Sequence, residues 1–335
     1  MIISRTPFRI SLFGGGTDYP TWVRHHGGAV FGLAIDKYCY LNVRSLPPFF
    51  DHKYRLAYSR IELAKTIEEI EHPAVRAVFS EMNANRGLEV HHDADLPARS
   101  GLGSSSSFTV GLLNALYAMR GEMISKRDLA NEAIRIEQEV IGENVGYQDQ
   151  VWAAYGGLNR IDFHTDGGFA VTPLIISPER RAELLSSMLL VFTGLSRIAS
   201  EVAKEKIENL EQRERQLMGI RAMVDEGVSL LSDEREPAYR LGELMHEAWQ
   251  LKRQLASSVS NPVVDEIYAE ARAAGASGGK LLGAGGGGFM VFFVKPEMRR
   301  RLIERLNRLI TVKFGIDYGG SKIIVYEPSY EVGAD

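Results

Sequence analysis

The chain has 335 residues, which is more than one hydrophobic core usually supports, so its length predicts two domains. With 45% hydrophobic and 24% charged residues, its composition excludes a disordered or fibrous protein. A net charge of -4 gives no general attraction to nucleic acid or to an anionic membrane, so small molecules are the expected partners.

The cysteine content and the N-terminus indicate a compartment. Cys39 is the single cysteine, so neither an internal disulfide nor a thiolate metal site can form, and a reducing cytoplasm fits. The N-terminal residues lack the apolar core of a signal peptide, and the apolar run 289–294 is too short to cross a bilayer. We therefore expect a soluble, cytoplasmic protein.

Residues 1–180 are predicted to form the first domain. Their periodicity and their glycine punctuation predict an alternation of strands and helices. The expected strands are 9–13, 29–43, 88–92 and 158–163, and the expected helices are 62–83, 104–119, 126–141 and 146–155.

Residues 181–335 are predicted to form the second domain, an α+β unit with an antiparallel sheet. The expected strands are 189–193, 289–294 and 321–326; the expected helices are 198–231, 234–258, 263–274 and 297–314, with a glycine-rich segment at 275–288. The helices between 198 and 258 either cover the sheet or mediate a homodimer.

A serine- and glycine-rich loop at 97–107 joins an expected strand to an expected helix. Gly101 and Gly103 let backbone N–H groups converge on an anion, and the following helix adds its positive N-terminus. The serines at 104 to 107 supply hydroxyls for phosphate oxygens or for magnesium. An ordinary N-cap behind a flexible loop is the alternative, and no Walker A pattern occurs.

The segment 6–20 places polar side chains at the end of a strand. Arg9 lies on the strand, and Asp18 follows three consecutive glycines. The Asp18 carboxylate could accept hydrogen bonds from two neighbouring sugar hydroxyls, or it could cap the turn.

Two carboxylates in the segment 136–150 occupy inward positions of predicted helices. Glu137 shares a stripe with Ala130 and Ala133, and Asp149 shares one with Trp152. Inward acids must be neutral, paired or bound to a cation, so they are either a metal ligand and a base or members of buried salt bridges. A further glycine-dense segment, 275–289, carries Lys280, which either reaches a phosphate or is exposed in a hairpin.

These segments together resemble the GHMP kinases, and the resemblance covers nearly the whole chain. It implies an α+β, two-domain GHMP kinase fold, with an N-terminal ribosomal protein S5 domain 2-like part and a C-terminal ferredoxin-like antiparallel sheet with helices. It also implies ATP as phosphate donor and Mg²⁺ as cofactor. The ATP-binding residues implied by the resemblance are Pro97, Ser100, Gly101, Leu102, Gly103, Ser104, Ser105, Ser106 and Ser107.

The resemblance also implies roles for individual side chains. Arg9 would lie beside the transferred phosphate, Asp149 would be the base, and Glu137 with Ser105 would bind magnesium. Whether Asp149 removes the proton or only orients the hydroxyl stays open. The implied substrate-binding residues are Gly15, Gly16, Thr17, Asp18, Tyr19, Lys37, Arg44, Gly285 and Gly286.

Within the family, residues 13–20, 35–38 and 46–50 are most similar to D-glycero-D-manno-heptose 7-phosphate kinases, which phosphorylate the anomeric hydroxyl. The three glycines at 14–16 depart from the Gly-Glu-His of galactokinase. Such a substrate needs a basic cradle for its own phosphate. The candidates, which could equally be solvated surface charges, are Lys37, Arg44, Lys53, Arg55, Arg60 and Arg197.

Three rival hypotheses remain. The first is another GHMP kinase, such as a fucokinase, a galactokinase or a kinase of isoprenoid precursors. A second is a non-catalytic sensor of sugar and ATP on the same fold. A third is a structural protein whose glycines serve close packing, which would leave Glu137 and Asp149 without an explanation.

Overall fold

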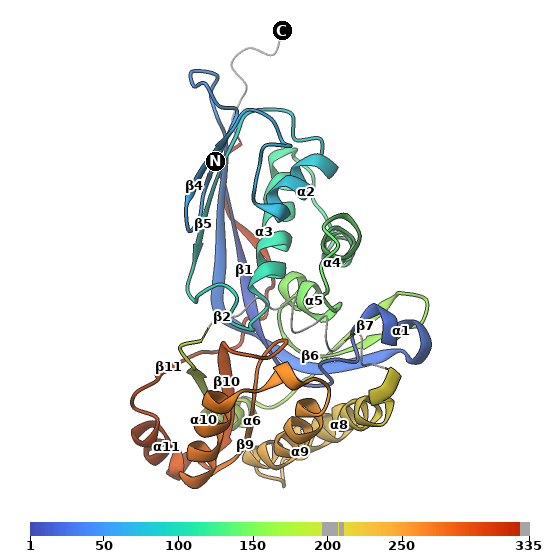
Figure 1. Cartoon of the computed structure of the whole chain (residues 1–335), viewed down its shortest axis with the longest axis vertical. Coiled ribbons are helices and arrows are strands. Elements are labelled where there is room, and N and C mark those ends of the chain that lie inside the picture. The colour runs from blue at the N-terminus through green and yellow to red at the C-terminus, as the bar shows by residue number, and fades with distance from the viewer. Residues whose placement is uncertain (196–206, 208–210, 329–335) are drawn as a thin grey trace.

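The computed structural model describes residues 1–195, 207 and 211–328, and two long N-terminal strands form the centre of its larger sheet (Figure 1). β1 (Ile2–Phe13) and β2 (Gly28–Ser45) pair antiparallel from Ile2 opposite Val43 to Phe13 opposite Phe31. The strand order is β12-β1-β2-β5-β3-β4, and β6 and β7 extend from the N-terminal half of β2. The remaining strands of this sheet are β3 (Tyr54–Ala57), β4 (Ile61–Ala64), β5 (Leu88–Ala94), β6 (Leu158–Phe163), β7 (Phe169–Pro173) and β12 (Lys322–Tyr326).

Helix α3 (Ser104–Met119) packs on one face of β1 and β2, and its bounds confirm the predicted helix 104–119. The close approach requires Gly111, since a Cβ there would lie 2.8 Å from Thr6 Oγ1 and 3.2 Å from Ser4 Oγ. The other helices of this part are α1 (Pro20–His26), α2 (Pro73–Glu81), α4 (Lys126–Arg135) and α5 (Gln148–Tyr155).

Helix α4 continues into one π-helical turn, Ile136–Val140. The N–H of Ile141 donates to the carbonyl of Ile136, five residues earlier, at 2.9 Å. Such a turn inserts one extra residue and is often found at functional sites. Here it carries Glu137, whose side chain is completely buried.

The second sheet is antiparallel, in the order β11-β8-β10-β9, and lies at the opposite end of the molecule from β3 and β4 (Figure 1). The two sheets with their helices confirm the predicted α+β class. The elements of this part are β8 (Met188–Phe192), β9 (Ala276–Leu281), β10 (Phe289–Val294), β11 (Ile310–Val312), α6 (Pro178–Ser187), α8 (Glu214–Ser232), α9 (Leu241–Arg253), α10 (Pro262–Ala273) and α11 (Arg299–Arg305). No helix within the described ranges is both long and apolar enough to cross a membrane.

Several predicted elements were wrong, each because of tertiary pairing or a proline. The helix expected at 62–83 begins only at Pro73, and the preceding Ile61–Ala64 is strand β4, paired with β3. The helix expected at 297–314 ends at Arg305, after which the β-branched Ile310–Val312 pairs with β8. Part of the glycine-rich segment 275–288 forms β9. The predicted helix 198–231 falls partly outside the described residues, as does Arg197.

The strand predicted at 321–326 belongs to the first sheet and not to the second. Lys322–Tyr326 pairs antiparallel with β1, with Ile2 opposite Tyr326. Thr6 Oγ1 and Ser321 Oγ lie 2.9 Å apart and reinforce this pairing. Nothing in the local pattern of the strand distinguishes a neighbour that lies more than 300 residues away in sequence.

Helix α9 crosses β9 so closely that both elements need glycine at the crossing. We expect Gly278→Ala to lower the free energy of unfolding by about 1–3 kcal/mol or more. The new methyl group would clash with a backbone atom of α9, which cannot turn aside as a flexible side chain can. A Cβ on Gly278 would lie 1.7 Å from the carbonyl oxygen of Gly242. The measurement is urea unfolding followed by circular dichroism.

Gly168→Ala is the matched control, because its new Cβ would meet only the flexible side chains of Asp166 and His164, at 3.1 Å and beyond. A midpoint for Gly278→Ala equal to that of Gly168→Ala would contradict the crossing geometry.

Candidate active site

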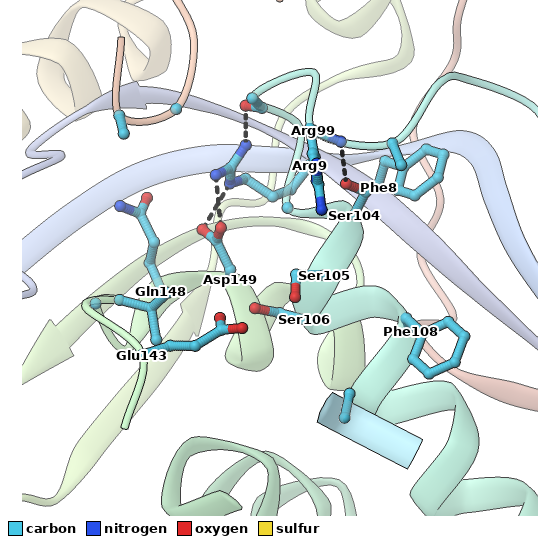
Figure 2. Close-up of a pocket in the computed structure, with 18 of the residues that line it drawn as sticks. Phe8, Arg9, Arg99, Ser104, Ser105, Ser106, Phe108, Glu143, Gln148 and Asp149 are labelled. Carbon is cyan, nitrogen blue, oxygen red and sulfur yellow. Dashed lines mark hydrogen bonds and ion pairs between the residues drawn. The ribbon is translucent and has the colours of Figure 1, made fainter. Parts of the chain in front are cut away.

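A cavity of about 800 Å³ lies where the N-terminal end of α3 meets the ends of β1, α5, α9 and the β9–β10 loop (Figure 2). Figure 2 shows Gln148, which bonds to Asp18, at one end of the cavity and Phe108 at the other. Phe108 stacks on His72, which in turn contacts Tyr58, so the first end is polar and the second aromatic. The middle carries Arg9, Asp149 and the first serines of α3. Three parts of the sequence that are far apart therefore contribute to one space.

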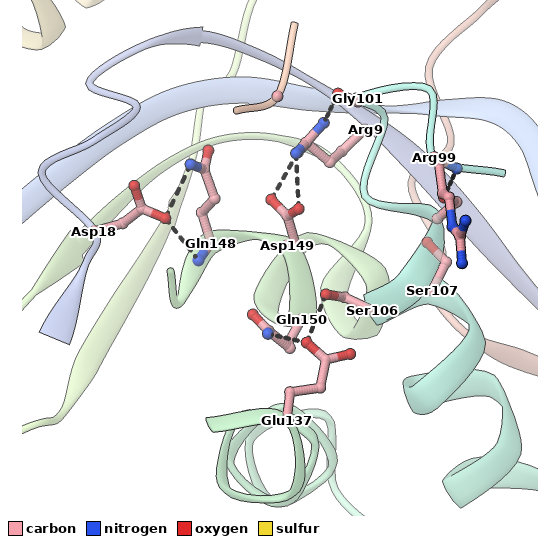
Figure 3. A network of polar contacts seen from close by, with 12 residues as sticks. Arg9, Asp18, Arg99, Gly101, Ser106, Ser107, Glu137, Gln148, Asp149 and Gln150 are labelled. Carbon is pink, nitrogen blue, oxygen red and sulfur yellow. Dashed lines mark hydrogen bonds and ion pairs between the residues drawn. The ribbon is translucent and has the colours of Figure 1, made fainter. Parts of the chain in front are cut away.

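Arg9 and Asp149 form a bidentate ion pair at the centre of the cavity (Figure 3). Arg9 Nε donates to Asp149 Oδ1 at 2.8 Å, and Nη2 donates to Oδ2 at 2.7 Å. The third donor, Nη1, reaches the carbonyl of Gly101 at 2.6 Å. Because two parallel bonds fix a guanidinium and a carboxylate in one plane, the pair holds both groups in a defined orientation.

Two glycine-rich loops pack directly on one another beside this pair. Gly101 has φ +81°, and a Cβ there would lie 2.6 Å from the carbonyl oxygen of Leu282. The carbonyl of Ser100 accepts from the N–H of Phe289 at 2.9 Å. A Cβ on Gly283 would lie 2.6 Å from the Gly101 Cα, so neither loop tolerates a side chain at the contact.

The N-terminus of α3 opens into the cavity without a side-chain cap. Its N-cap is Gly103, at φ +76°, which has no hydroxyl or carboxylate to accept the first N–H groups of the helix. These N–H groups and the helix dipole are therefore available to an anion such as a phosphate.

The four serines at this N-terminus point in different directions. Ser104 Oγ accepts from the N–H of Arg99 at 3.2 Å, and Ser105 is exposed in the cavity. Ser106 Oγ donates to Glu137 at 2.8 Å, while Ser107 Oγ donates to the carbonyl of Pro7 at 2.8 Å. Two hydroxyls thus remain near the cavity surface, and two are used inside the fold.

Glu137 lies directly beneath the serines and is fully buried. Burial raises the pKa of its carboxyl to about 7, although the nearby hydroxyls of Thr109 and Ser106 and the amide of Gln150 oppose the shift. Its Oε2 accepts from Ser106 and Gln150, whereas Oε1 has no protein partner (Figure 3). A carboxylate oxygen without a partner in this setting fits a cation ligand.

The surroundings of Glu137 fit magnesium. Mg²⁺ prefers oxygen ligands and is usually held by one or two carboxylates together with phosphate oxygens. Ser105 and Glu143 line the cavity, whereas Glu137 lies beneath its wall, and burial raises the pKa of Glu143. Within the described part of the chain no group of three or more His, Cys, Asp or Glu is arranged to hold a metal ion.

Asp18 closes the polar end of the cavity. Its Oδ1 accepts from the N–H of Gly16 at 2.9 Å, and Oδ2 accepts from Gln148 Nε2 at 2.9 Å. Burial, and to a smaller extent the charge of Asp149, raises the pKa of Asp18 against these hydrogen bonds. Gly146 permits this approach, because a Cβ there would lie 1.9 Å from Asp18 Oδ2.

The structure does not bring every predicted site residue to the cavity. Thr17 is buried and donates to the carbonyls of Gly14 and Ala29, so it stabilises the turn. Lys37 pairs with Asp36, and Arg44 and Arg55 both pair with Glu89 on the sheet. The predicted residues that do not line the cavity are Thr17, Lys37, Arg44, Pro97, Ser100, Leu102, Ser107, Glu137, Gly285 and Gly286. Those that do are Arg9, Gly15, Gly16, Asp18, Tyr19, Gly101, Gly103, Ser104, Ser105, Ser106 and Asp149, and of the basic candidates Arg60.

Some cavity residues were missed or misread in the sequence. Lys280 is buried and donates to the carbonyl of Leu12 at 2.8 Å. Lys252, which was not predicted, donates to the carbonyls of Leu281 and Gly283 at 2.7 and 2.8 Å. Lys252 lies three residues after the buried Trp249 on α9 and therefore on the same face of the helix. The helical periodicity that placed Glu137 on an inward stripe could also have identified Lys252 as inward.

The raised pKa of Glu137 predicts a pH dependence of stability in the absence of metal. Between the ordinary carboxyl pKa and about 7, the folded protein holds a proton that the unfolded chain has lost, so stability falls as pH rises through this window. Glu137→Gln removes the ionisation. We expect the variant to gain about 1–3 kcal/mol relative to wild type between pH 5 and pH 8.

The measurement is urea unfolding of both proteins in EDTA at the two pH values. Asp18 and Glu143 are present in both proteins, so the difference reports the ionisation of Glu137 together with its electrostatic interaction with Glu143. A constant stability difference between pH 5 and pH 8 would contradict the buried, protonated carboxyl.

Comparisons with known proteins identify the family. Residues 70–157 match the model of the GHMP kinase N-terminal domain, and residues 234–309 match that of the GHMP kinase C-terminal domain. A mevalonate kinase from Methanothermobacter thermautotrophicus is 32% identical over 67% of this chain and 72% of its own length. D-glycero-alpha-D-manno-heptose 7-phosphate kinase from Campylobacter jejuni is 28% identical over 92% of this chain and 93% of its own.

The same arrangement of elements occurs in solved structures. A D-glycero-D-manno-heptose 1-phosphate kinase from Bacteriodes thetaiotaomicron superposes with a TM-score of 0.78 at 23% identity, covering 96% of this chain and 98% of the other. At this identity the likeness concerns the fold, and it confirms the predicted two-domain architecture of helices and sheets. Motif order, matched domains and fold agree, and the chain belongs to the GHMP kinase family.

Proposed function

We propose that this GHMP kinase transfers the γ-phosphoryl group of ATP to the anomeric hydroxyl of D-glycero-D-manno-heptose 7-phosphate, giving the 1,7-bisphosphate. One observation supports the reaction type above the others: the Arg9–Asp149 pair lies in one cavity with the uncapped N-terminus of α3. A phosphate donor and a hydroxyl acceptor can therefore meet at the same point.

The cavity has a place for each part of the two substrates. The triphosphate fits the N–H groups at the start of α3 and the two glycine loops. The nucleoside fits the aromatic end, where His72 and Phe108 stack with ring centroids 4.7 Å apart. The sugar fits the polar end beside Asp18, which leaves its reacting hydroxyl next to Asp149.

In the proposed reaction, the acceptor oxygen forms a bond to the γ-phosphorus while the bond to the β,γ-bridging oxygen breaks, and ADP leaves with that electron pair. Asp149 accepts the hydrogen bond of the acceptor hydroxyl and then its proton. Arg9 holds Asp149 in place and offers positive charge next to the transferred group. Since a carboxylate is a weak base toward an alcohol, positioning contributes a large share of the rate.

Glu137 and Ser105 would hold magnesium, with Glu143 close by, and the ion when bound neutralises charge on the phosphate oxygens. Oε1 of Glu137 has no protein partner and is therefore available to a cation, but Glu137 is fully buried and does not line the cavity, so this role requires a local movement that brings the carboxylate and the ion together.

The proposed acceptor rests on two supports. The resemblance to heptose 7-phosphate kinases lies in residues 13–20, 35–38 and 46–50, and the Campylobacter jejuni relative of that name is matched along 93% of its length. Asp18 and its neighbours suit a polyhydroxylated ligand, because a buried carboxylate is compensated by hydroxyl donors. Of the basic residues that line the cavity, Lys252 and Lys280 are the candidates to face the substrate phosphate, because Arg60 donates to Tyr58 at the aromatic end and Arg99 lies away from Asp18 (Figure 3).

Asp149→Asn tests the assignment. We expect kcat to fall roughly 10²- to 10⁴-fold with little change in the KM for ATP, because the amide keeps the shape but cannot accept the proton. The measurement is an ADP-release assay on heptose 7-phosphate, fucose, galactose and mannose.

Asp162→Asn is the control, since Asp162 also pairs with an arginine, Arg160 at 2.8 Å, but does not line the cavity. If heptose 7-phosphate is the only sugar phosphorylated, the proposed substrate is supported. If only another of the four sugars is phosphorylated, that sugar is the acceptor and the proposed substrate is wrong. Equal kcat for Asp149→Asn and wild type would remove Asp149 from the reaction.

A further inference from the structure

Two buried side chains at the polar end of the cavity each have a hydrogen-bonding atom without a protein partner. Ser11 is 6% exposed and Gln148 is 9% exposed, and both line the cavity. Neither Ser11 Oγ nor Gln148 Oε1 has a partner. Because buried polar atoms in folded proteins are almost always paired, two such atoms in one cavity wall indicate a ligand group that pairs with them.

The surrounding contacts fix what Gln148 offers to a ligand. Its Nε2 donates to Asp18 Oδ2 at 2.9 Å, which directs the amide nitrogen toward the carboxylate (Figure 3). The amide oxygen is therefore the part left for the ligand, and an amide oxygen can only accept a hydrogen bond.

Ser11 lies two residues after Arg9 on β1, so both side chains are on the same face of the strand. Its hydroxyl can both donate and accept. Gly15 lies beside both Ser11 and Gln148. A Cβ on Gly15 would lie 3.5 Å from Ser11 Oγ and 3.7 Å from Gln148 Nε2, within the space between the two side chains. Glycine at this position thus leaves room where any other residue would place a carbon atom.

We propose that Ser11 and Gln148, with the space above Gly15, bind a second hydroxyl group of the acceptor. That hydroxyl donates to Gln148 Oε1 and accepts from Ser11 Oγ. A carbonyl or ether cannot donate to Gln148, and a deoxy carbon can satisfy neither group. The subsite therefore selects a polyhydroxylated acceptor; this inference rests on the proposed function and specifies how its acceptor is recognised.

Ser11→Ala and Gly15→Ala test the subsite from two directions. Ser11→Ala removes one hydrogen bond, and we expect the KM for the acceptor to rise roughly 3- to 10-fold. Gly15→Ala fills the space, and we expect a rise of at least about tenfold. The φ of Gly15 lies outside the left-handed region and its new Cβ would make only ordinary contacts, so the variant should fold like wild type. The KM for ATP should stay within about twofold in both.

Ser187→Ala is the matched control. Ser187 is also buried and its Oγ also has no partner, but it lies at the end of α6 and does not line the cavity. We expect its kinetic constants to equal those of wild type. A rise in acceptor KM for Ser187→Ala as large as for Ser11→Ala would overturn the proposal.

Deoxy analogues of the acceptor identify the bound hydroxyl. With the wild-type enzyme, one deoxy analogue should show a kcat/KM roughly 3- to 10-fold lower than the complete acceptor. With Ser11→Ala the same analogue and the complete acceptor should differ little, because the hydrogen bond between Ser11 Oγ and that hydroxyl is already absent. Equal losses for both enzymes with every analogue would mean that the two polar atoms bind only a structural water, which overturns the proposal.

The two levels of inference fail in different ways. Absence of wild-type turnover on every sugar contradicts the proposed function. Turnover by wild type with an unchanged acceptor KM in both Ser11→Ala and Gly15→Ala contradicts the hydroxyl subsite and leaves the proposed function intact.

Discussion

The bidentate ion pair between Arg9 and Asp149 is the contact on which the arrangement of the site depends. It joins β1 to α5, and through Nη1 of Arg9 it also holds the Gly101 carbonyl. Gly103, which lies against both side chains, has φ +76°, a backbone conformation that favours glycine. β1, the loop that contains Gly101, and α5 are thereby held in fixed positions relative to one another before any substrate binds.

Several carboxylates face this one cavity or lie just beneath it, and each has a different kind of hydrogen-bond or ion-pair partner. Asp149 is paired with Arg9, Asp18 accepts neutral hydrogen bonds, and Glu137 is left with one oxygen unpaired. Burial raises the pKa of Asp18 and Glu137, so ionising them favours the binding of cations or hydroxyl donors. In the absence of ligands these carboxylates are therefore poorly compensated, and the binding of a cation or of hydroxyl donors stabilises their charged form.

Local patterns in the sequence predicted much of the fold and part of the site. Helix 104–119 was predicted with its correct ends, and the helical period placed Glu137 inside. The roles of the four serines could not be predicted, because successive residues of a helix point about 100° apart and only the tertiary neighbours decide which hydroxyl meets Glu137 and which meets Pro7. For the same reason residues 310–312 and 62–64 were wrongly predicted to be helical, because the strands they pair with, β8 and β3, are not apparent from the local sequence.

The pairing of β12 with β1 has a consequence for how the chain acquires its structure. During synthesis β1 is made first, but the edge of its first residues, Ile2 to Arg5, stays uncovered until residues 322–326 have emerged. An open edge of a long, apolar strand is a template for pairing with other chains, and a contact between such distant segments forms slowly. Nascent and truncated forms that lack β12 therefore expose this stretch of β1 to pairing with other chains, and β12 protects it in the finished molecule.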